Sequence, residues 1–303
     1  MSVQVTTAHV EQYKSSVYHL VQQKGSKVRK SVMIENVRGK NAFIDQVGST
    51  AAQIRTSRHG DSPIMNTPHA RRRLSLADYE WGDMVDRQDV IRMLTDPSSK
   101  YVEAANWAMG RSIDDVILDA ITATAYTGVD GSTSTTFDTN MVVDVQTVWP
   151  GVSAADTGLN LAKLIEARKL LGQNDVDPEE EVFVPVNQTQ ISSLLKDERV
   201  ISGDYNKALP LMDGYVSRVG GCTLIPCNRI NTDANSDEIV PFYTRTGIAL
   251  GIGEDVVSRA TERADKGYNY YIYLCMSIGA TRLEEKRVGY IECDPGGSPT
   301  TDA

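Results

Sequence analysis

Hydrophobic positions recur at helical spacing in two long segments of the chain. Apolar side chains at every third or fourth position predict a helix from about Ala8 to Gln23, which Gly25 ends. A second stripe follows Asp96, a good N-cap, and Pro97, which suits the first helical position, and it continues until Gly128. About 30 residues at 1.5 Å each predict a rod of ~45 Å.

Shorter helices and strands are predicted further along the chain. Apolar spacing predicts a helix from Leu161 to Gly172, and Asn187 with Gln190 predicts the cap of another that continues through Lys196. Strands are predicted over residues 182–186, 222–225, 242–244, 247–251, 268–278 and 287–293. Turn-forming residues fill 129–139, and the tail 294–303 is expected to be flexible.

The segment 41–75 has a different character, because small, polar, Gly and Pro residues replace the regular apolar pattern. Folded back on itself, it would form a hairpin with arms of up to ~17 residues, reaching up to ~55 Å at strand rise. An isolated two-stranded ribbon is only marginally stable in water, so such a hairpin needs a surface to lie on. A disordered linker is the alternative interpretation.

Composition and length exclude several classes of protein. The 303 residues suggest about two domains or one large one, and 41% hydrophobic with 23% charged residues is typical of a folded soluble chain. No apolar run reaches the ~18 residues of a membrane span, and the N-terminus lacks a secretory signal, so synthesis in the cytoplasm is expected. Four cysteines without a CxxC pair argue against a disulfide framework or a zinc module.

The net charge of −9 hides an uneven distribution along the sequence. Residues 1–75 hold 12 Lys and Arg against 4 Asp and Glu, a balance of +8, and the remainder carries −17. Such a division indicates either an arm that binds nucleic acid or an arm that lies on the acidic body of another copy. The charges alone do not choose between the two.

Candidate catalytic chemistry is sparse. The four histidines, His9, His19, His59 and His69, all fall in the basic segment, so a His-based catalytic arrangement would have to use that arm. HExxH, GxSxG and CxxC motifs are missing from the sequence. We therefore predict that the chain is not an enzyme, and we predict no catalytic, cofactor-binding or metal-binding residues.

Four charged motifs are each explained without a catalytic or metal site. Asp233, Asn235 and Asp237 imitate the start of a calcium loop, but the sixth and twelfth positions do not fit, so a polar surface turn is expected. The acidic runs 179–181 and 284–285 are interpreted as solvated faces. The run Arg71 to Arg73 could bind phosphates or form salt bridges at a protein contact.

Two stretches carry a resemblance to a known family. The C-terminal stretch, Ala264 to Tyr268 and then Gly279 to Val288, and the opening Thr6 to Lys24 resemble the major capsid proteins of tailed bacteriophages, which have the Hong Kong 97-type fold. By order of elements the resemblance covers essentially the whole chain, but it is specific only in these stretches.

The resemblance implies an α+β, Hong Kong 97-like subunit with four parts and a flexible tail. These would be an N-terminal arm (1–40), an extended β-hairpin loop (41–75), a peripheral domain with a long spine helix (76–150 and 240–293), an axial α/β domain (151–239) and the tail (294–303). We expect intersubunit contacts from the loop arginines Arg55, Arg58, Arg71, Arg72 and Arg73.

The implied function is that of a structural shell subunit, which assembles with itself as hexamers and pentamers around the double-stranded DNA of a phage head. The protein would be assembled in the host cytoplasm and would then be part of the virion. A portal at one vertex and a decoration protein would be further partners. Some family members cross-link through a loop lysine, but no lysine lies between Lys40 and Lys100. Others begin with a cleaved scaffolding segment, whereas this sequence opens almost directly with the arm, so we expect a separate scaffolding protein. An encapsulin-type compartment, a nucleic-acid-binding protein and an unseen enzyme remain as alternatives.

Overall fold

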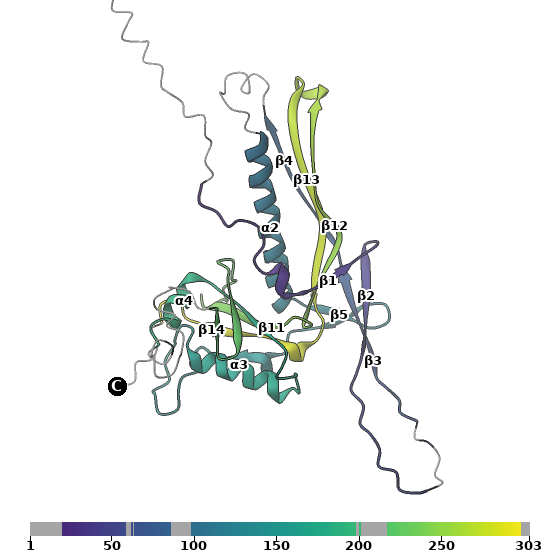
Figure 1. The fold of residues 1–303 in the computed structure, drawn as a ribbon, viewed down its shortest axis with the longest axis vertical. Coiled ribbons are helices and arrows are strands. Elements are labelled where there is room, and N and C mark those ends of the chain that lie inside the picture. Colours follow the sequence, from purple (N-terminus) through teal and green to yellow (C-terminus); the bar gives the residue numbers. More distant parts are fainter. Residues whose placement is uncertain are drawn as a thin grey trace, which may run out of the picture. The chain divides into compact units, whose positions relative to one another are not determined.

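The computed structural model describes residues 20–58, 62, 64–85, 98–197, 200 and 217–297 (Figure 1). Contacts divide the chain into two compact units. The first consists of residues 1–26, 78–112 and 254–276, and the second of residues 27–77, 113–253 and 277–303. Each unit is therefore assembled from segments that are far apart in the sequence.

The helices include the long rod that the apolar stripe predicted. The α-helices are α2 (Ser98–Thr122), α3 (Leu161–Gln173) and α4 (Gln188–Leu194), and the short 3-10 helices are η2 (Arg29–Ser31), η3 (Thr139–Met141), η4 (Ala264–Lys266) and η5 (Glu285–Arg287). The 25 residues of α2 correspond to ~38 Å. Asp96 and Pro97 lie outside the described residues.

Two helix predictions need correction. The rod ends at Thr122 and not near Gly128, because Ala125–Thr127 forms a strand that pairs with the extended loop. Strand pairing overrides the helical apolar spacing at this point. Most of the helix predicted over residues 8–23 lies outside the described residues, and its last four residues are not helical.

The strands of the described residues form three sheets. They are β1 (Met33–Asn36), β2 (Asn41–Val47), β3 (His69–Ser75), β4 (Ala77–Val85), β5 (Ala125–Thr127), β6 (Thr133–Thr135), β7 (Val142–Val143), β8 (Val182–Val186), β9 (Arg218–Val219), β10 (Cys222–Pro226), β11 (Glu238–Thr244), β12 (Ile248–Arg263), β13 (Asn269–Arg282) and β14 (Val288–Cys293). The strand orders are β1-β12-β13-β4, β7-β14-β11-β8-β10-β9 and β2-β3-β5-β6.

The six-stranded sheet carries the main apolar core of the second unit. Buried side chains of α3 and α4 pack with those of the sheet, including Leu164, Ile191 and Phe242. Both helices begin after an Asn N-cap. The side chain of Asn160 accepts from the backbone N–H of Lys163, and the side chain of Asn187, the predicted cap, accepts from the backbone N–H of Gln190. The strands predicted at 182–186 and 222–225 are confirmed.

The strands β12 and β13 are longer than their apolar patterns predicted. β12 has 16 residues and β13 has 14. The outer part of β12, from Glu254 onward, is mostly exposed, so it carries no alternation of apolar and polar positions that would reveal a strand. At the turn between the strands, Gly267 and Tyr268 adopt left-handed backbone angles, with φ of 66° and 57°.

The hairpin predicted for the extended loop is confirmed at its base. β2 and β3 pair antiparallel from Asn41↔Ser75 to Val47↔His69, and we call this pair the β2–β3 ribbon. The backbone N–H of Gly48 donates one further bond to the Pro68 carbonyl, 2.8 Å away. Beyond this point, the described residues run away from β2 and β3 as a long loop (Figure 1).

A small apolar cluster supports the start of the ribbon. It consists of four buried side chains, which we call the apolar seat: Val37, Leu74, Ala249 and Leu283. Gly251 gives the seat its room, because a Cβ atom at this position would overlap a methyl group of Leu74 and come within 3.0 Å of Val37 Cγ2. The base of the ribbon is therefore fixed to the rest of the second unit through β3.

Candidate functional site at the base of the extended loop

The two faces of the β2–β3 ribbon have different surroundings, because successive side chains of a strand point to opposite faces. One face is turned inward, toward the rest of the second unit, and holds the more buried residues, Ala42, Ile44, Gln46, Arg72 and Leu74. The other face is outward and carries Phe43, Asp45, Val47, Arg71 and Arg73. The run of three arginines is thus divided between the faces.

The outward face combines apolar and charged side chains. Arg71 Nε donates to Asp45 Oδ1 over 2.6 Å, and the hydrogen bond holds the pKa of the Asp45 carboxyl below its usual value. The Arg71 guanidinium lies 5.5 Å from the ring centroid of Phe43, and Arg73 lies 4.5 Å from that of Tyr126. Phe43 and Tyr126 are 43% and 40% exposed, so this face presents aromatic and cationic groups together.

Arg55 and Arg58 are exposed side chains in the part of the loop beyond the ribbon. Arg55 Nε donates to the Ser57 carbonyl over 2.8 Å, and its Nη2 contacts the carbonyl of Arg58. These are local bonds within one turn of the loop. Both arginines therefore belong to a solvent-exposed segment, in which the Arg55 side chain binds nearby backbone carbonyls.

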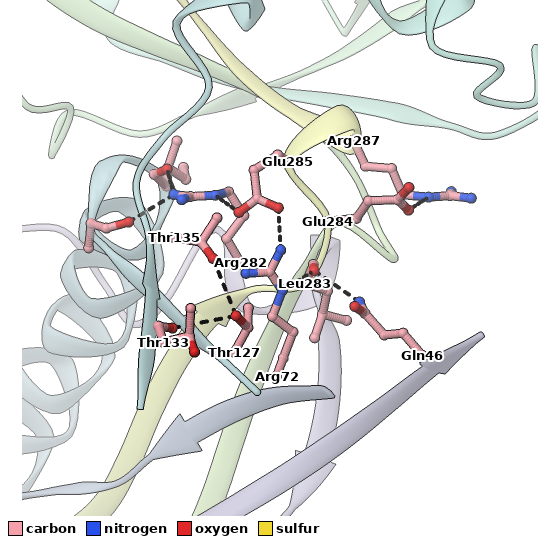
Figure 2. Close-up of polar contacts among 12 residues, drawn as sticks. Gln46, Arg72, Thr127, Thr133, Thr135, Arg282, Leu283, Glu284, Glu285 and Arg287 are labelled. Carbon is pink, nitrogen blue, oxygen red and sulfur yellow. Dashed lines mark hydrogen bonds and ion pairs between the residues drawn. The ribbon is translucent and has the colours of Figure 1, made fainter. Parts of the chain in front are cut away.

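Arg72 belongs to a buried polar cluster of its own chain (Figure 2). It is 7% exposed, its Nε donates to the Leu283 carbonyl over 2.8 Å, and its Nη2 forms an ion pair with the Glu285 carboxylate. The Gln46 side chain donates to the same Leu283 carbonyl over 2.9 Å. Both strands of the ribbon therefore bind the turn that follows β13.

Arg282 joins this cluster to the end of α2. Its fully buried guanidinium donates through Nη1 to the carbonyls of Ile121 and Ala123, at 2.5 and 2.9 Å, and through Nε to Glu285 Oε1 at 3.2 Å. A cation that binds the last carbonyls of a helix also interacts favourably with the helix dipole. Burial lowers the pKa of Arg282, and Glu285 opposes that change.

A second ion-pair group lies on the same turn but nearer to solvent. Arg287 Nη1 donates to both carboxylate oxygens of Glu180, at 2.6 and 2.7 Å, and its Nε donates to Glu284 at 2.8 Å. The bond to Glu180 is the main reason that the pKa of Arg287 is raised. The Glu284 side chain is 49% exposed, compared with 17% for Glu285.

The interpretation of Glu284 and Glu285 as a solvated pair is wrong for Glu285. Adjacent residues point apart, and only one of the two carboxylates turns inward, where it meets two guanidinium groups. The sequence held one signal for the cluster. Arg282 continues the even-numbered positions of β13 that bury Ile272 and Leu274, so its side chain falls on the buried face of that strand.

The other candidate groups have structural roles. The Asp233 carboxylate accepts from the backbone N–H groups of Asn235 and Asp237, at 2.8 and 2.9 Å, which confirms a polar turn. Within the described ranges, no group of three or more His, Cys, Asp or Glu side chains is placed to hold a metal ion. Of the histidines, His69 lies in β3, and His9, His19 and His59 fall outside the described residues.

Lys163 is a buried cation that sequence reasoning missed. It is 0% exposed, and its Nζ donates to the carbonyls of Thr157 and Glu292 at 2.7 and 2.8 Å. Burial lowers its pKa. Its contacts are two backbone carbonyls from distant parts of the second unit, so it stabilises a chain crossing and offers no open site.

Comparison with known proteins decides the family. The family model described as phage capsid protein matches residues 5–295. The chain belongs to the phage capsid protein family. It is therefore a structural protein of the virion, and the match favours a phage capsid over an encapsulin-type compartment. No curated protein sequence matches the chain.

Solved capsid structures share the fold over nearly the whole chain. The capsid of cyanophage P-SCSP1u matches with a TM-score of 0.75 and 15% identity, covering 96% of this chain and 94% of that one. The capsid of Ralstonia phage GP4 matches with a TM-score of 0.70 and 12% identity, covering 97% of each chain. Cyanophage Pam1 matches with a TM-score of 0.67, 13% identity, and 95% and 97% coverage. The fold of this phage capsid protein is the predicted α+β, Hong Kong 97-type fold. Among the described residues, no helix is long and apolar enough to cross a membrane.

Proposed function

We propose that this capsid protein is the major shell subunit of a tailed-phage head and that its copies assemble, as hexamers and pentamers, around double-stranded DNA. The observation that supports the proposal best is the extended loop, whose described residues run away from β2 and β3 (Figure 1). Several of its apolar side chains are exposed in the subunit. Ile54 and Ile64 are 91% and 95% exposed, and Val47 at the end of the ribbon is 68% exposed. Exposed apolar side chains grouped on one segment are typical of an interface.

In this proposal the extended loop, residues 41–75, lies on a neighbouring copy. The remaining parts keep the assignments that the sequence suggested, with an arm (1–40), a peripheral domain (76–150 and 240–293), an axial domain (151–239) and a tail (294–303). The basic balance of residues 1–75 and the acidic balance of the remainder would attract between copies.

The five loop arginines divide into two groups. Arg55, Arg58, Arg71 and Arg73 lie where a neighbour could reach them, on the loop or on the outward face of the ribbon, and we propose them as intersubunit contacts. Arg72 is engaged by its own chain, so its part in assembly would be to hold the ribbon in place. Charged contacts of this kind set register and association rate more than affinity.

Further partners follow from the proposed role in a phage head. They are a separate scaffolding protein, a portal at one vertex and a decoration protein on the outside, with assembly in the host cytoplasm. The absence of enzymatic activity also stays a prediction, which the structural role favours.

The test is assembly of the full chain, followed by negative-stain microscopy and nuclease treatment. Closed shells that protect double-stranded DNA would support the proposal, and shells that contain cargo protein instead would contradict it. For the arginines, R55E/R58E should slow assembly while the monomer keeps its circular dichroism spectrum, and the control R55K/R58K should assemble like the native chain. Added salt should weaken native assembly in the same direction, because the Debye length falls. Assembly of R55E/R58E at the native rate would refute this role.

A further inference from the structure

We propose that Glu285 is the positioning residue of the extended loop. Its carboxylate joins a ribbon arginine to Arg282, which binds the end of α2, and this Arg72–Glu285–Arg282 bridge sets the direction of the β2–β3 ribbon relative to the rest of the second unit (Figure 2). The bridge acts on the ribbon separately from the folding of the six-stranded sheet. Its importance for assembly rests on the function proposed above.

The bridge connects two parts of the chain that are 213 residues apart in sequence, the strand β3 and the turn that follows β13. Arg72 comes from β3, Arg282 from the last position of β13, and Glu285 from η5. Of the three side chains, Glu285 is the one that contacts both of the others. Because Arg282 also binds the Ile121 and Ala123 carbonyls, the ribbon is connected through Glu285 to the end of the α2 rod.

The charges make the bridge dependent on a single carboxylate. Two buried guanidinium groups share one anionic partner, and among the described residues Arg72 Nη1 and Arg282 Nη2 have no hydrogen-bond acceptor. Without Glu285, two like charges would face each other in a site from which water is largely excluded.

The ribbon has few other connections that would fix its direction. Its pairing with β5 covers two positions, Arg72↔Thr127 and Arg73↔Tyr126. The apolar seat contacts the ribbon near its base, through Leu74 and through the partly buried Ala42 and Ile44. Gln46 adds one hydrogen bond to the Leu283 carbonyl. Toward the other end of the ribbon, Val47 and His69 are exposed. The bridge therefore lies at the point about which an unsupported ribbon would turn.

The same turn offers a matched control. Glu284 precedes Glu285 and pairs with Arg287, but this pair is partly exposed and lies apart from the bridge. E284Q and E285Q thus remove the same charge from neighbouring positions, and only the second variant removes it from the bridge. Hydrogen–deuterium exchange of the unassembled full chain reports separately on the ribbon and on the core strands.

We expect E285Q to increase exchange of the ribbon amides, residues 41–47 and 69–75, by about tenfold or more, with exchange in β8, β10 and β14 unchanged. E284Q should stay within about twofold of the native chain throughout. If E285Q does not fold, R72M removes the ribbon's guanidinium while leaving the Glu285–Arg282 pair, and it should free the ribbon in the same way. Unchanged ribbon exchange, or equal increases in the ribbon and the core strands, would overturn the proposal.

This measurement is independent of shell formation. Failure of the native chain to form shells would refute the proposed function and leave the bridge intact as a property of the monomer. Normal shells from the native chain, with no ribbon release in E285Q and R72M, would refute the bridge alone.

Discussion

The contact between Leu74 and Gly251 predicts a strong coupling between two small substitutions in the apolar seat. Leu74 is fully buried and occupies the space that a side chain at position 251 would need. L74A removes a branched side chain from this space, and G251A adds a methyl group to it. Each change alone should destabilise the second unit, whereas together they should compensate.

The magnitudes follow from known core substitutions. A buried Leu→Ala change costs about 2–5 kcal/mol, because a cavity remains, and overpacking a filled core costs about 1–3 kcal/mol. Independent effects would make the double variant about 5.5 kcal/mol less stable than the native chain when mid-range values are added. If the methyl group added at position 251 fills part of the cavity, the double variant should cost about 3 kcal/mol, a coupling of about 2.5 kcal/mol.

Urea unfolding of the native chain, both single variants and the double variant would measure this coupling as a double-mutant cycle. Gly253 supplies the matched control, because a Cβ atom there would meet Leu76 Cδ1 at 2.6 Å and not Leu74. L74A/G253A should therefore be additive within about 0.5 kcal/mol. Additive costs in L74A/G251A would mean that Leu74 does not lie against Gly251 and that the ribbon is seated elsewhere.

Three further predictions address other parts of the molecule. Burial lowers the pKa of Lys163 in the folded chain, so the unfolded chain binds more protons. The native chain should therefore gain stability relative to K163M as the pH rises toward the pKa of lysine in the unfolded chain, about 10.4. Urea unfolding of both proteins at several pH values checks this, and a pH-independent difference in stability would contradict it. Leu274 is 0% exposed, and burying a Leu side chain contributes roughly 1.5–3 kcal/mol. L274D should therefore yield insoluble or unassembled subunits in a sedimentation assay. Normal particles from this variant would show that β13 is misplaced. The loop has no lysine between Lys40 and Lys100, so boiled particles should run as a 33.2 kDa monomer on a denaturing gel, and a ladder of oligomers would refute the absence of cross-links.

The sequence predicted those elements whose apolar pattern is set by one buried face. The rod α2, the helix α3 and the strands β8 and β10 follow directly from such patterns. The outer half of β12 did not, because its side chains are exposed and its extended form depends on pairing with β13. The early end of α2 was also missed, since β5 forms through pairing with β3, a contact between segments about 50 residues apart.

The candidate site was only partly predictable for a related reason. The loop arginines stood out as a basic run, but spacing within a strand could not show which of them faces the body. Arg72 turns inward, and its partner Glu285 belongs to a turn more than 200 residues away. We therefore expect R72E/R73E to disturb the fold at the base of the loop before any effect on assembly is seen, because a carboxylate at position 72 would face Glu285.

The two-faced ribbon has a consequence for how this protein tolerates change. Substitutions on the inward face, at positions such as Ile44 and Leu74, meet the chain's own side chains and should register in the stability of the single subunit. Substitutions on the outward face, at Val47 for example, meet mostly solvent in the subunit and should have little effect on its stability. Alternate residues of one short hairpin would then evolve under separate selection. The even positions of β2 would be selected for the stability of the subunit, and the odd positions for contact with the surface that the loop covers. A variant library scored once for folding and once for assembly should separate these two sets at single-residue spacing.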